Sequence, residues 1–359
     1  MHVPDGFIDP PVSAVTGVVA AAAVAVSLRG ARRELGERTA PLAGLLAAFI
    51  FAVQMLNFPV AAGTSGHLLG GALAAILVGP CTGILCVSVV LLMQGVLFAD
   101  GGLTALGVNI TDMAIITSVV GYLVFRGLVK VLPRRRSSVT AASFVAALLS
   151  VPAAAVAFTL LYALGGTTDV ALGKVATAMI GVHLLIGIGE AAITALTVGA
   201  VLAVRPDLVY GARGLSTPLK LRVGGDLIDA APATAAAPAA ESAPAPAARS
   251  HRRLWLTGLA ASLVLAGVVS FYASADPDGL EKVAHDKGID KSAEEHAAAD
   301  SPLADYGVKD ITDARISGGL AGVIGVGVTV AAGTAVFWVL RRRRGGDAGP
   351  AAVPEGERV

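Results

Sequence analysis

Nine apolar runs, separated by short polar segments, follow one another along the chain. They cover residues 11–28, 40–58, 67–79, 81–98, 103–128, 139–164, 174–204, 254–273 and 317–340. Most reach the roughly 20 residues that an α-helix needs to cross the hydrocarbon core of a bilayer. The run 67–79 is shorter and ends at Gly79-Pro80, so it predicts a half-buried or tilted helix leading directly into the next one. The pattern predicts an all-α integral membrane protein with nine spans.

The distribution of basic residues predicts the orientation of these helices. With the N-terminus outside, 21 of the 27 Lys and Arg residues fall in cytoplasmic connections, including Arg134–Arg136 and Arg341–Arg344. Because cytoplasmic loops of membrane proteins carry an excess of Lys and Arg, we expect an outside N-terminus and a cytoplasmic C-terminus. The chain is 55% hydrophobic and 15% charged, as expected of a multi-pass protein of the cell membrane. Its net charge of +1 gives no reason to expect a nucleic-acid partner.

A change in composition divides the chain into two modules. Residues 1–222 hold the first seven runs and predict a seven-span bundle. Residues 223–253 are rich in Ala and Pro, which predicts a flexible cytoplasmic linker. Residues 254–344 predict a two-span module around a polar extracytoplasmic loop, 274–316, and 345–359 form a cytoplasmic tail. We therefore expect two functional units fused in one polypeptide.

The first two residues, Met1-His2, are candidate metal ligands. The α-amine of Met1, the deprotonated amide nitrogen of His2 and its imidazole would close a five-membered and a six-membered chelate ring around one ion. This requires an intact N-terminus. The stretch MHVPDGFIDPP lacks the basic region of a secretory signal, and the bulky His2 disfavours removal of Met1, so we expect the amine to be free. From the spacing alone, an ordinary exposed histidine is the alternative.

His67 is the candidate for a fourth nitrogen ligand. In the predicted topology the Gly-rich connection from Asn57 to His67 is extracytoplasmic, on the same face as Met1 and His2. Non-helical backbone at membrane depth needs a cavity or surrounding protein, so this loop is expected to fold into a cavity. Four nitrogens in a plane suit Ni²⁺ or Cu²⁺ better than Zn²⁺. We expect binding to weaken as the pH falls, because the amine and imidazoles must lose protons to bind.

Further polar residues are candidates for supporting this centre. Those expected near the ligands are Asn57, Ser65, Asn109 and Asp112. Asp112 could accept a hydrogen bond from a ligand imidazole, or bond across helices instead. His183 and Glu190 lie seven residues apart on one face of the seventh apolar run. These two residues either form a structural pairing through neighbouring helices or belong to the path of the metal through the membrane.

The loop 274–316 is acidic and contains two histidines. Its charged candidates are Asp276, Asp278, Glu281, Asp286, Asp290, Glu294, Glu295, Asp300, Asp305, Asp310, Asp313, His285 and His296. Such a loop either raises the local cation concentration and hands metal to the site, or is simply a solvated loop kept out of the bilayer by its charges.

Several segments together resemble a known family. MHVPDGFIDPPV, FAVQMLNFPVAAGTSGHLLGGALAAILVGP, LFADGGLTALGVNITDMAI and GVHLLIGIGEAAIT resemble the substrate-specific membrane component of energy-coupling-factor transporters for nickel and cobalt, over about residues 1–205. PDGLEKVAHDKG and SPLADYGV resemble its small accessory subunit, here fused to it. The resemblance implies a metal site built from the Met1 amine, the His2 amide and imidazole nitrogens, and the His67 imidazole. TSGH with QMLNFPV is closer to nickel-type members, so Ni²⁺ is the expected cargo and Co²⁺ the alternative.

The resemblance also implies a transmembrane coupling subunit and cytoplasmic ATPase subunits as partners, besides membrane lipid. The sequence agrees, because Gly173-Lys174 lacks the spacing of a nucleotide-binding loop. We expect a transport component with no enzyme activity and no cofactor beyond the transported ion. One alternative is a proton-coupled secondary metal carrier that uses Asp112, His183 and Glu190 as a relay. The other is an intramembrane metalloenzyme using His183 and Glu190, which the absence of an HExxH cluster disfavours.

Overall fold

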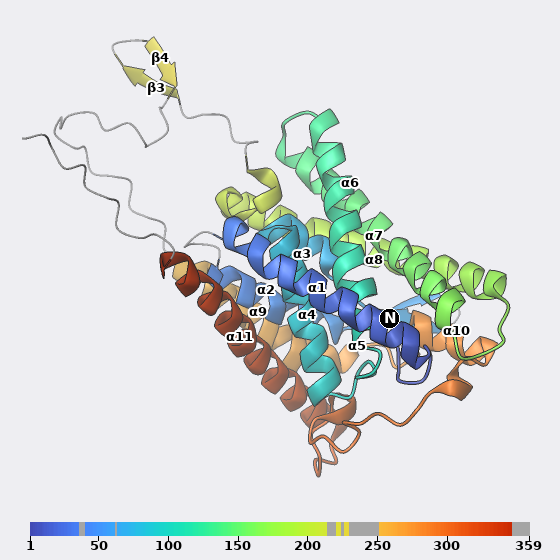
Figure 1. The fold of residues 1–359 in the computed structure, drawn as a ribbon. Helices are drawn as coiled ribbons and strands as arrows, with labels where there is room; N and C mark the ends of the chain where they lie inside the picture. The colour runs from blue at the N-terminus through green and yellow to red at the C-terminus, as the bar shows by residue number, and fades with distance from the viewer. Residues whose placement is uncertain (36–39, 62, 214–219, 224–225, 230–250, 347–359) are drawn as a thin grey trace, which may run out of the picture.

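A computed structural model describes residues 1–35, 40–61, 63–213, 220–223, 226–229 and 251–346. Within them the chain is almost entirely helical (Figure 1). The long helices are α1 (Pro10–Glu34), α2 (Ala40–Gln54), α4 (Pro80–Leu97), α6 (Thr117–Val131), α7 (Arg136–Gly165), α8 (Leu172–Val204), α9 (His251–Gly267) and α11 (Ala314–Gly346). The short helices are α3 (Gly71–Val78), α5 (Leu106–Asn109) and α10 (Gly279–Lys287), and a π-helix (Ile110–Ile116) joins α5 to α6.

Each of the nine predicted runs contains a helix. Seven helices among the described residues are long and apolar enough to cross a membrane, five in the first module and two in the second. This confirms the predicted fold class, an all-α integral membrane protein. The runs 40–58 and 67–79 form the shorter helices α2, of 15 residues, and α3, of 8. All eight residues of α3 are buried, so this helix is enclosed by the bundle.

An antiparallel hairpin connects these two short helices along the chain. Strand β1 (Phe58–Ala61) pairs with β2 (Thr64–Gly66), with Phe58 opposite Gly66. The chain then enters α3 through Gly70, whose φ of +86° is a left-handed conformation that glycine adopts without strain. The predicted helix at 67–79 therefore begins only at Gly71, because the backbone must first turn sharply after His67.

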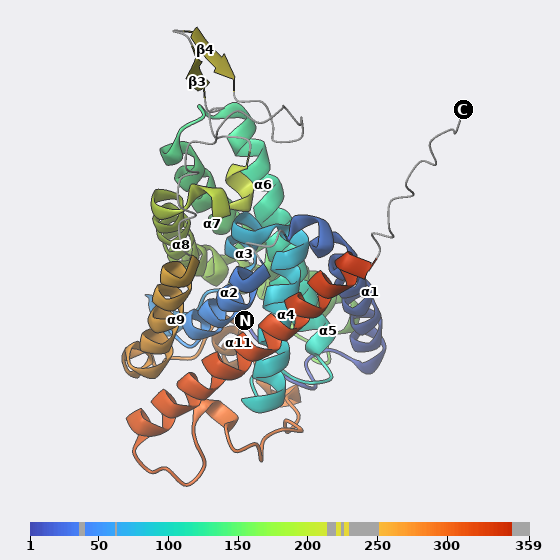
Figure 2. The same cartoon turned by 90° about the vertical axis from the view of Figure 1, so that its left-hand side faces the viewer.

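The second module packs directly against the first. Both α9 and α11 lie against α2, and α11 also contacts α4 (Figure 2). The close approach depends on small residues, since a Cβ added at Gly44 of α2 would lie 2.9 Å from the backbone nitrogen of Thr334. Most of the predicted linker, residues 230–250, and the tail residues 347–359 lie outside the described residues. The described ends of the linker are ordered elements instead of a flexible chain, since β3 (Lys220–Val223) pairs with β4 (Asp226–Asp229) at its start and α9 begins at His251.

Candidate metal centre

The N-terminal segment is held inside the bundle by hydrogen bonds on both sides. The side chain of Asn109 accepts from Val3 N at 2.7 Å and donates to Val3 O at 3.1 Å. The Asp5 carboxylate accepts from the backbone nitrogens of Leu103 and Thr104. The chain then enters α1, whose first turn is capped by the side chain of Asp9. Met1 and His2 are consequently buried, at 2% and 9% exposed.

The His67 loop is fixed by two residues from neighbouring helices. The Glu190 carboxylate of α8 accepts from Leu69 N at 2.6 Å and from Gly70 N at 3.0 Å. From α2, Gln54 Nε2 donates to Leu69 O at 3.1 Å. These bonds satisfy the backbone of a buried, non-helical turn, which would otherwise be costly. They hold His67, 4% exposed, at the end of the hairpin.

His67 presents the correct nitrogen for metal binding. Its Nδ1 lies 3.0 Å from Leu68 O. A carbonyl oxygen only accepts hydrogen bonds, so Nδ1 carries the ring proton and Nε2 carries the lone pair. Hydrogen bonding of the second ring nitrogen to a carbonyl is the usual arrangement of a metal-ligating histidine.

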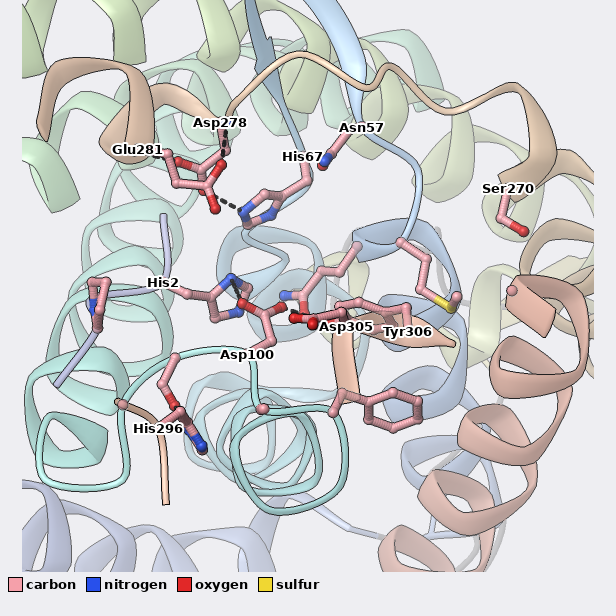
Figure 3. Close-up of a pocket in the computed structure, with 18 of the residues that line it drawn as sticks. His2, Asn57, His67, Asp100, Ser270, Asp278, Glu281, His296, Asp305 and Tyr306 are labelled. Atoms are coloured by element: carbon pink, nitrogen blue, oxygen red, sulfur yellow. Dashed lines mark hydrogen bonds and ion pairs between the residues drawn. The ribbon is translucent and has the colours of Figure 1, made fainter. Parts of the chain in front are cut away.

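The Met1 nitrogen and the Asp278 carboxylate both lie beside His67 Nε2, and Figure 3 shows Asp278 next to His67. The Met1 nitrogen, an ammonium group here, lies 2.5 Å from His67 Nε2 and 2.5 Å from Asp278 Oδ2. His67 Nε2 and Asp278 Oδ2 are 3.4 Å apart. Burial alone would raise the pKa of Asp278, but the Met1 ammonium and His67 hold that pKa well below its usual range. The terminal nitrogen thus occupies the position between an imidazole and a carboxylate.

The His2 imidazole is oriented by a chain of hydrogen bonds. Asp100 Oδ2 accepts from the Tyr306 hydroxyl at 2.6 Å, and this hydroxyl accepts from Gln94 Nε2 at 2.9 Å. Gln94 therefore turns its Oε1 toward His2 Nε2, 3.1 Å away, and accepts a hydrogen bond from the protonated ring nitrogen. In the neutral ring this leaves the lone pair on Nδ1, the atom that closes a six-membered ring with the His2 amide.

The electrostatic environment of His2 also favours a bound cation. Burial lowers the pKa of His2 to about 4, although Asp100 acts in the opposite direction. The neutral ring places its Nδ1 lone pair 3.2 Å from Asp100 Oδ1, and a cation could bridge these two acceptors. The His2 and His67 rings are stacked with centroids 5.1 Å apart. One ligand atom from each of His2, His67 and Asp278 lies within 4.8 Å of the other two, so these three side chains could hold one metal ion.

A cavity of about 600 Å³ opens beside these residues. Its lining from the first module includes His2, Gln54, Asn57, His67 and Asp100, and its lining from the second includes Asp278, Glu281, Glu294, His296, Asp305 and Tyr306. Part of the acidic loop therefore faces the candidate ligands, whereas Asp286, for example, pairs with Lys282 at the surface. An acidic cavity attracts cations.

The four residues that the sequence predicted to support the metal centre make different contacts in the structure. Asn109 holds the N-terminal segment. Asn57 lines the cavity, and its carbonyl accepts from Ser274 N at 2.7 Å. The Ser65 hydroxyl donates to Asp276 O at 2.8 Å. Asp112 is fully buried with both carboxylate oxygens unpaired among the described residues, while Leu68 forms the hydrogen bond to His67 that Asp112 was one candidate to form.

His183 and Glu190 do not pair with each other. Glu190 binds the backbone of Leu69 and Gly70, and His183 Nδ1 lies 2.7 Å from Met179 O. His183 Nε2 is buried with no hydrogen-bond partner among the described residues. Glu190 thus supports the His67 loop directly.

Sequence reasoning missed Gln94, Asp100 and Tyr306 as neighbours of the ligands, and it named Asp278 only as one of many charged residues of the acidic loop. Asp278 and Glu281 form a capping box at the start of α10, and this D-x-x-E spacing is readable in the sequence. It predicts where a helix begins, but it gives no indication that the cap residue reaches the N-terminus. Gln94 and Asp100 carry no comparable signal.

Comparisons with known proteins identify the family of the chain. The family model described as "Cobalt uptake substrate-specific transmembrane region" (CbiM) matches residues 2–208, more than half of the chain. The chain belongs to the CbiM family. A second model, the PDGLE domain, matches residues 252–342. The protein is therefore a multi-pass membrane component of transition-metal uptake and not an enzyme, which confirms the prediction for its class.

Individual relatives and a solved structure are also similar to this chain. The chain is 40% identical over 210 residues to a putative metal transport protein of Haloquadratum walsbyi, covering 58% of this chain and 94% of that protein. It is 40% identical over 211 residues to a putative fused nickel transport protein of Archaeoglobus fulgidus, covering 58% of this chain and 68% of that protein. A crystal structure described as a truncated transition metal transporter matches with a TM-score of 0.50 and 30% identity, covering 56% of this chain and 99% of that one.

Proposed function

We propose that this CbiM-family protein captures Ni²⁺, or alternatively Co²⁺, at the outer face of the cell membrane. Its ligands are the Met1 amine, the His2 amide and Nδ1 nitrogens, and His67 Nε2. The observation that carries the proposal is the 2.5 Å contact between the Met1 nitrogen and His67 Nε2, with His2 stacked on His67. Two residues at the chain end and one that is 65 positions beyond His2 thereby supply four nitrogens to one point.

The chemistry of this donor set supports the choice of metal. A deprotonated amide is a strong-field donor, so a planar set of four nitrogens favours late first-row ions with a preference for that geometry. Relatives include proteins described as fused nickel transport proteins and as cobalt transport proteins. The motif TSGH with QMLNFPV favours Ni²⁺ as the cargo of this chain.

The same proposal includes the topology and the partners. An outside N-terminus and a cytoplasmic C-terminus follow from the positions of the basic residues. A transmembrane coupling subunit and cytoplasmic ATPase subunits supply the energy, since the sequence has no nucleotide-binding loop of its own. We divide the chain into a metal-binding module (1–222), a linker (223–253), an accessory module (254–344) and a tail (345–359).

The test acetylates the Met1 amine of the full chain. Acetylation keeps every side chain but removes the amine donor, so the two fused chelate rings cannot both form. Purified protein is titrated with Ni²⁺ by calorimetry, with its N-terminus verified by mass spectrometry. We expect loss of high-affinity binding and of the visible absorption band of planar Ni²⁺. Unchanged affinity and spectrum would exclude the chelate.

His67→Ala tests the fourth ligand separately. It removes one donor but leaves both chelate rings, so we expect weaker binding and a shifted absorption band rather than complete loss. His285→Ala serves as the matched control, because His285 is exposed on α10 and does not line the cavity.

A further inference from the structure

The accessory module reaches the proposed metal centre at two separate points. Asp278, at the start of α10, contacts the Met1 nitrogen. Tyr306, toward the end of the loop 274–316, contacts both residues that orient His2. The first point meets the amine of the Met1-His2 chelate, and the second meets the residues that contact its imidazole. Figure 3 shows Asp278 beside His67 and Asp100 beside His2.

At the first point, the backbone around Asp278 is rigidly placed. Oδ1 of Asp278 accepts from Leu280 N and Glu281 N at 2.7 and 2.9 Å, which leaves Oδ2 free to meet Met1. Gly279 lies directly on α8, where an added Cβ would be 2.7 Å from Ile186 Cδ1. The segment before it is bonded to the hairpin, since Ser65 N donates to Pro277 O at 2.9 Å. The carboxylate is therefore positioned relative to the His67 loop itself.

At the second point, the backbone turns sharply to direct Tyr306 inward. Asp305 and Tyr306 have φ angles of +53° and +55°, in a region that residues other than glycine rarely adopt. Asp305 N donates to Phe98 O at 2.9 Å, and the Tyr306 ring stacks on Phe98 with centroids 4.9 Å apart. The hydroxyl then joins Gln94 to Asp100, and strained backbone of this kind is often found where a side chain has a function.

We propose that Asp278 and Tyr306 are positioning residues for the metal chelate. Asp278 holds the terminal nitrogen beside His67, and Tyr306 fixes the His2 ring through Gln94 and Asp100. The inference rests on the proposed chelate and gives the fused accessory module a defined role, which is to order the end of the chain. Chain termini are mobile unless they are tied down, and a ligand set that is ordered in advance binds its ion more tightly.

Two conservative variants of the full chain test this inference. Asp278→Asn keeps an oxygen to cap α10, because Asn caps helices as well as Asp, but it removes the charge that faces Met1. Tyr306→Phe keeps the ring on Phe98 and removes only the hydroxyl. The matched controls are Asp286→Asn, an exposed residue on the same helix, and Tyr272→Phe, which is 82% exposed in the same module.

Ni²⁺ affinity and the visible spectrum of the saturated protein are measured for each variant. We expect Asp278→Asn and Tyr306→Phe to lower the affinity about 10- to 100-fold, as is typical for residues that orient metal ligands, with an unchanged absorption band. The controls should bind as the parent protein does. When either variant is combined with acetylation of the Met1 amine, it should cost no further affinity, because the chelate it positions is already absent.

The outcomes separate this inference from the proposed function. If acetylation of Met1 abolishes the planar Ni²⁺ spectrum while Asp278→Asn and Tyr306→Phe bind normally, the positioning role is excluded and the chelate stands. A shifted absorption band in Asp278→Asn would also overturn positioning, because Asp278 would then be a ligand. An additional loss in the combined variants would show a general structural effect and contradict the inference. If acetylation has no effect, both proposals fail.

Discussion

Glu190 provides the sharpest test of how the bundle positions His67. Its two carboxylate oxygens accept separately from Leu69 N at 2.6 Å and Gly70 N at 3.0 Å, directly after the candidate ligand. Glu190 is fully buried, so removing the carboxylate leaves these amide groups without water as a substitute. The effect of substitution should therefore scale with the number of N–H groups left unpaired.

The expected magnitude follows from that count. An unsatisfied buried N–H costs about 1–3 kcal/mol, so Glu190→Ala, which leaves two, should lower the free energy of unfolding by about 2–6 kcal/mol. Glu190→Gln retains one carbonyl oxygen and turns an NH₂ group toward the second N–H, so it should cost about half as much. Gln has nearly the same volume as Glu, which keeps the cavity term small in this variant. In both variants the His67 loop loosens, and Ni²⁺ affinity should fall in the same order.

The assay is thermal unfolding of the metal-free protein in detergent, followed by Ni²⁺ titration. Glu295→Gln, at an exposed position of the acidic loop, is the matched control and should change neither quantity. The reasoning is refuted if Glu190→Gln and Glu190→Ala unfold at the temperature of the control. It is also refuted if the Ala variant is no less stable than the Gln variant, because the effect would then not depend on the number of hydrogen bonds.

Two further predictions concern the seating of α10 and the dependence on pH. Gly279→Ala should lower Ni²⁺ affinity about tenfold, because its Cβ would lie 2.7 Å from Ile186 and 2.8 Å from Val182 and would lift Asp278 from its place. Gly173→Ala, where nothing lies within 4 Å, should bind Ni²⁺ normally, and equal affinities in the two titrations would contradict the packing argument. Ni²⁺ affinity should also fall as the pH is lowered, because the amine and amide nitrogens of the chelate must lose protons to bind. Burial lowers the pKa of His2 to about 4, so the His2 ring stays neutral above that pH, and calorimetry showing constant or rising affinity on acidification would count against an amine ligand.

Some features of the centre could be predicted from residues that are close in sequence. Met1 and His2 are covalent neighbours, so the two chelate rings are a local property of the chain. The apolar runs indicated the membrane helices because their length and composition are set by the bilayer. The Gly-rich segment before His67 also indicated a non-helical loop, although the hairpin and the late start of α3 depend on how that loop is buried.

Other features depended on contacts that no local pattern specifies. Asp278 lies 277 positions from Met1, and Tyr306 lies 212 positions from Gln94. Asp278 could be recognised as a helix cap, but the seating of Gly279 on α8 decides which group its second oxygen meets. Glu190 offered both a structural and a functional interpretation, and only the folded chain directs it to the His67 loop.

The sequence by itself determined the membrane helices, the division of the chain into two modules and the candidate ligands Met1, His2 and His67. These depend on composition, on hydrophobic pattern and on residues adjacent in the chain. Only the tertiary structure decided that the accessory module contributes Asp278 and Tyr306 to the same point. The physical reason is that a buried charge and a buried ring need partners, and the packing of distant helices determines which partners are within reach.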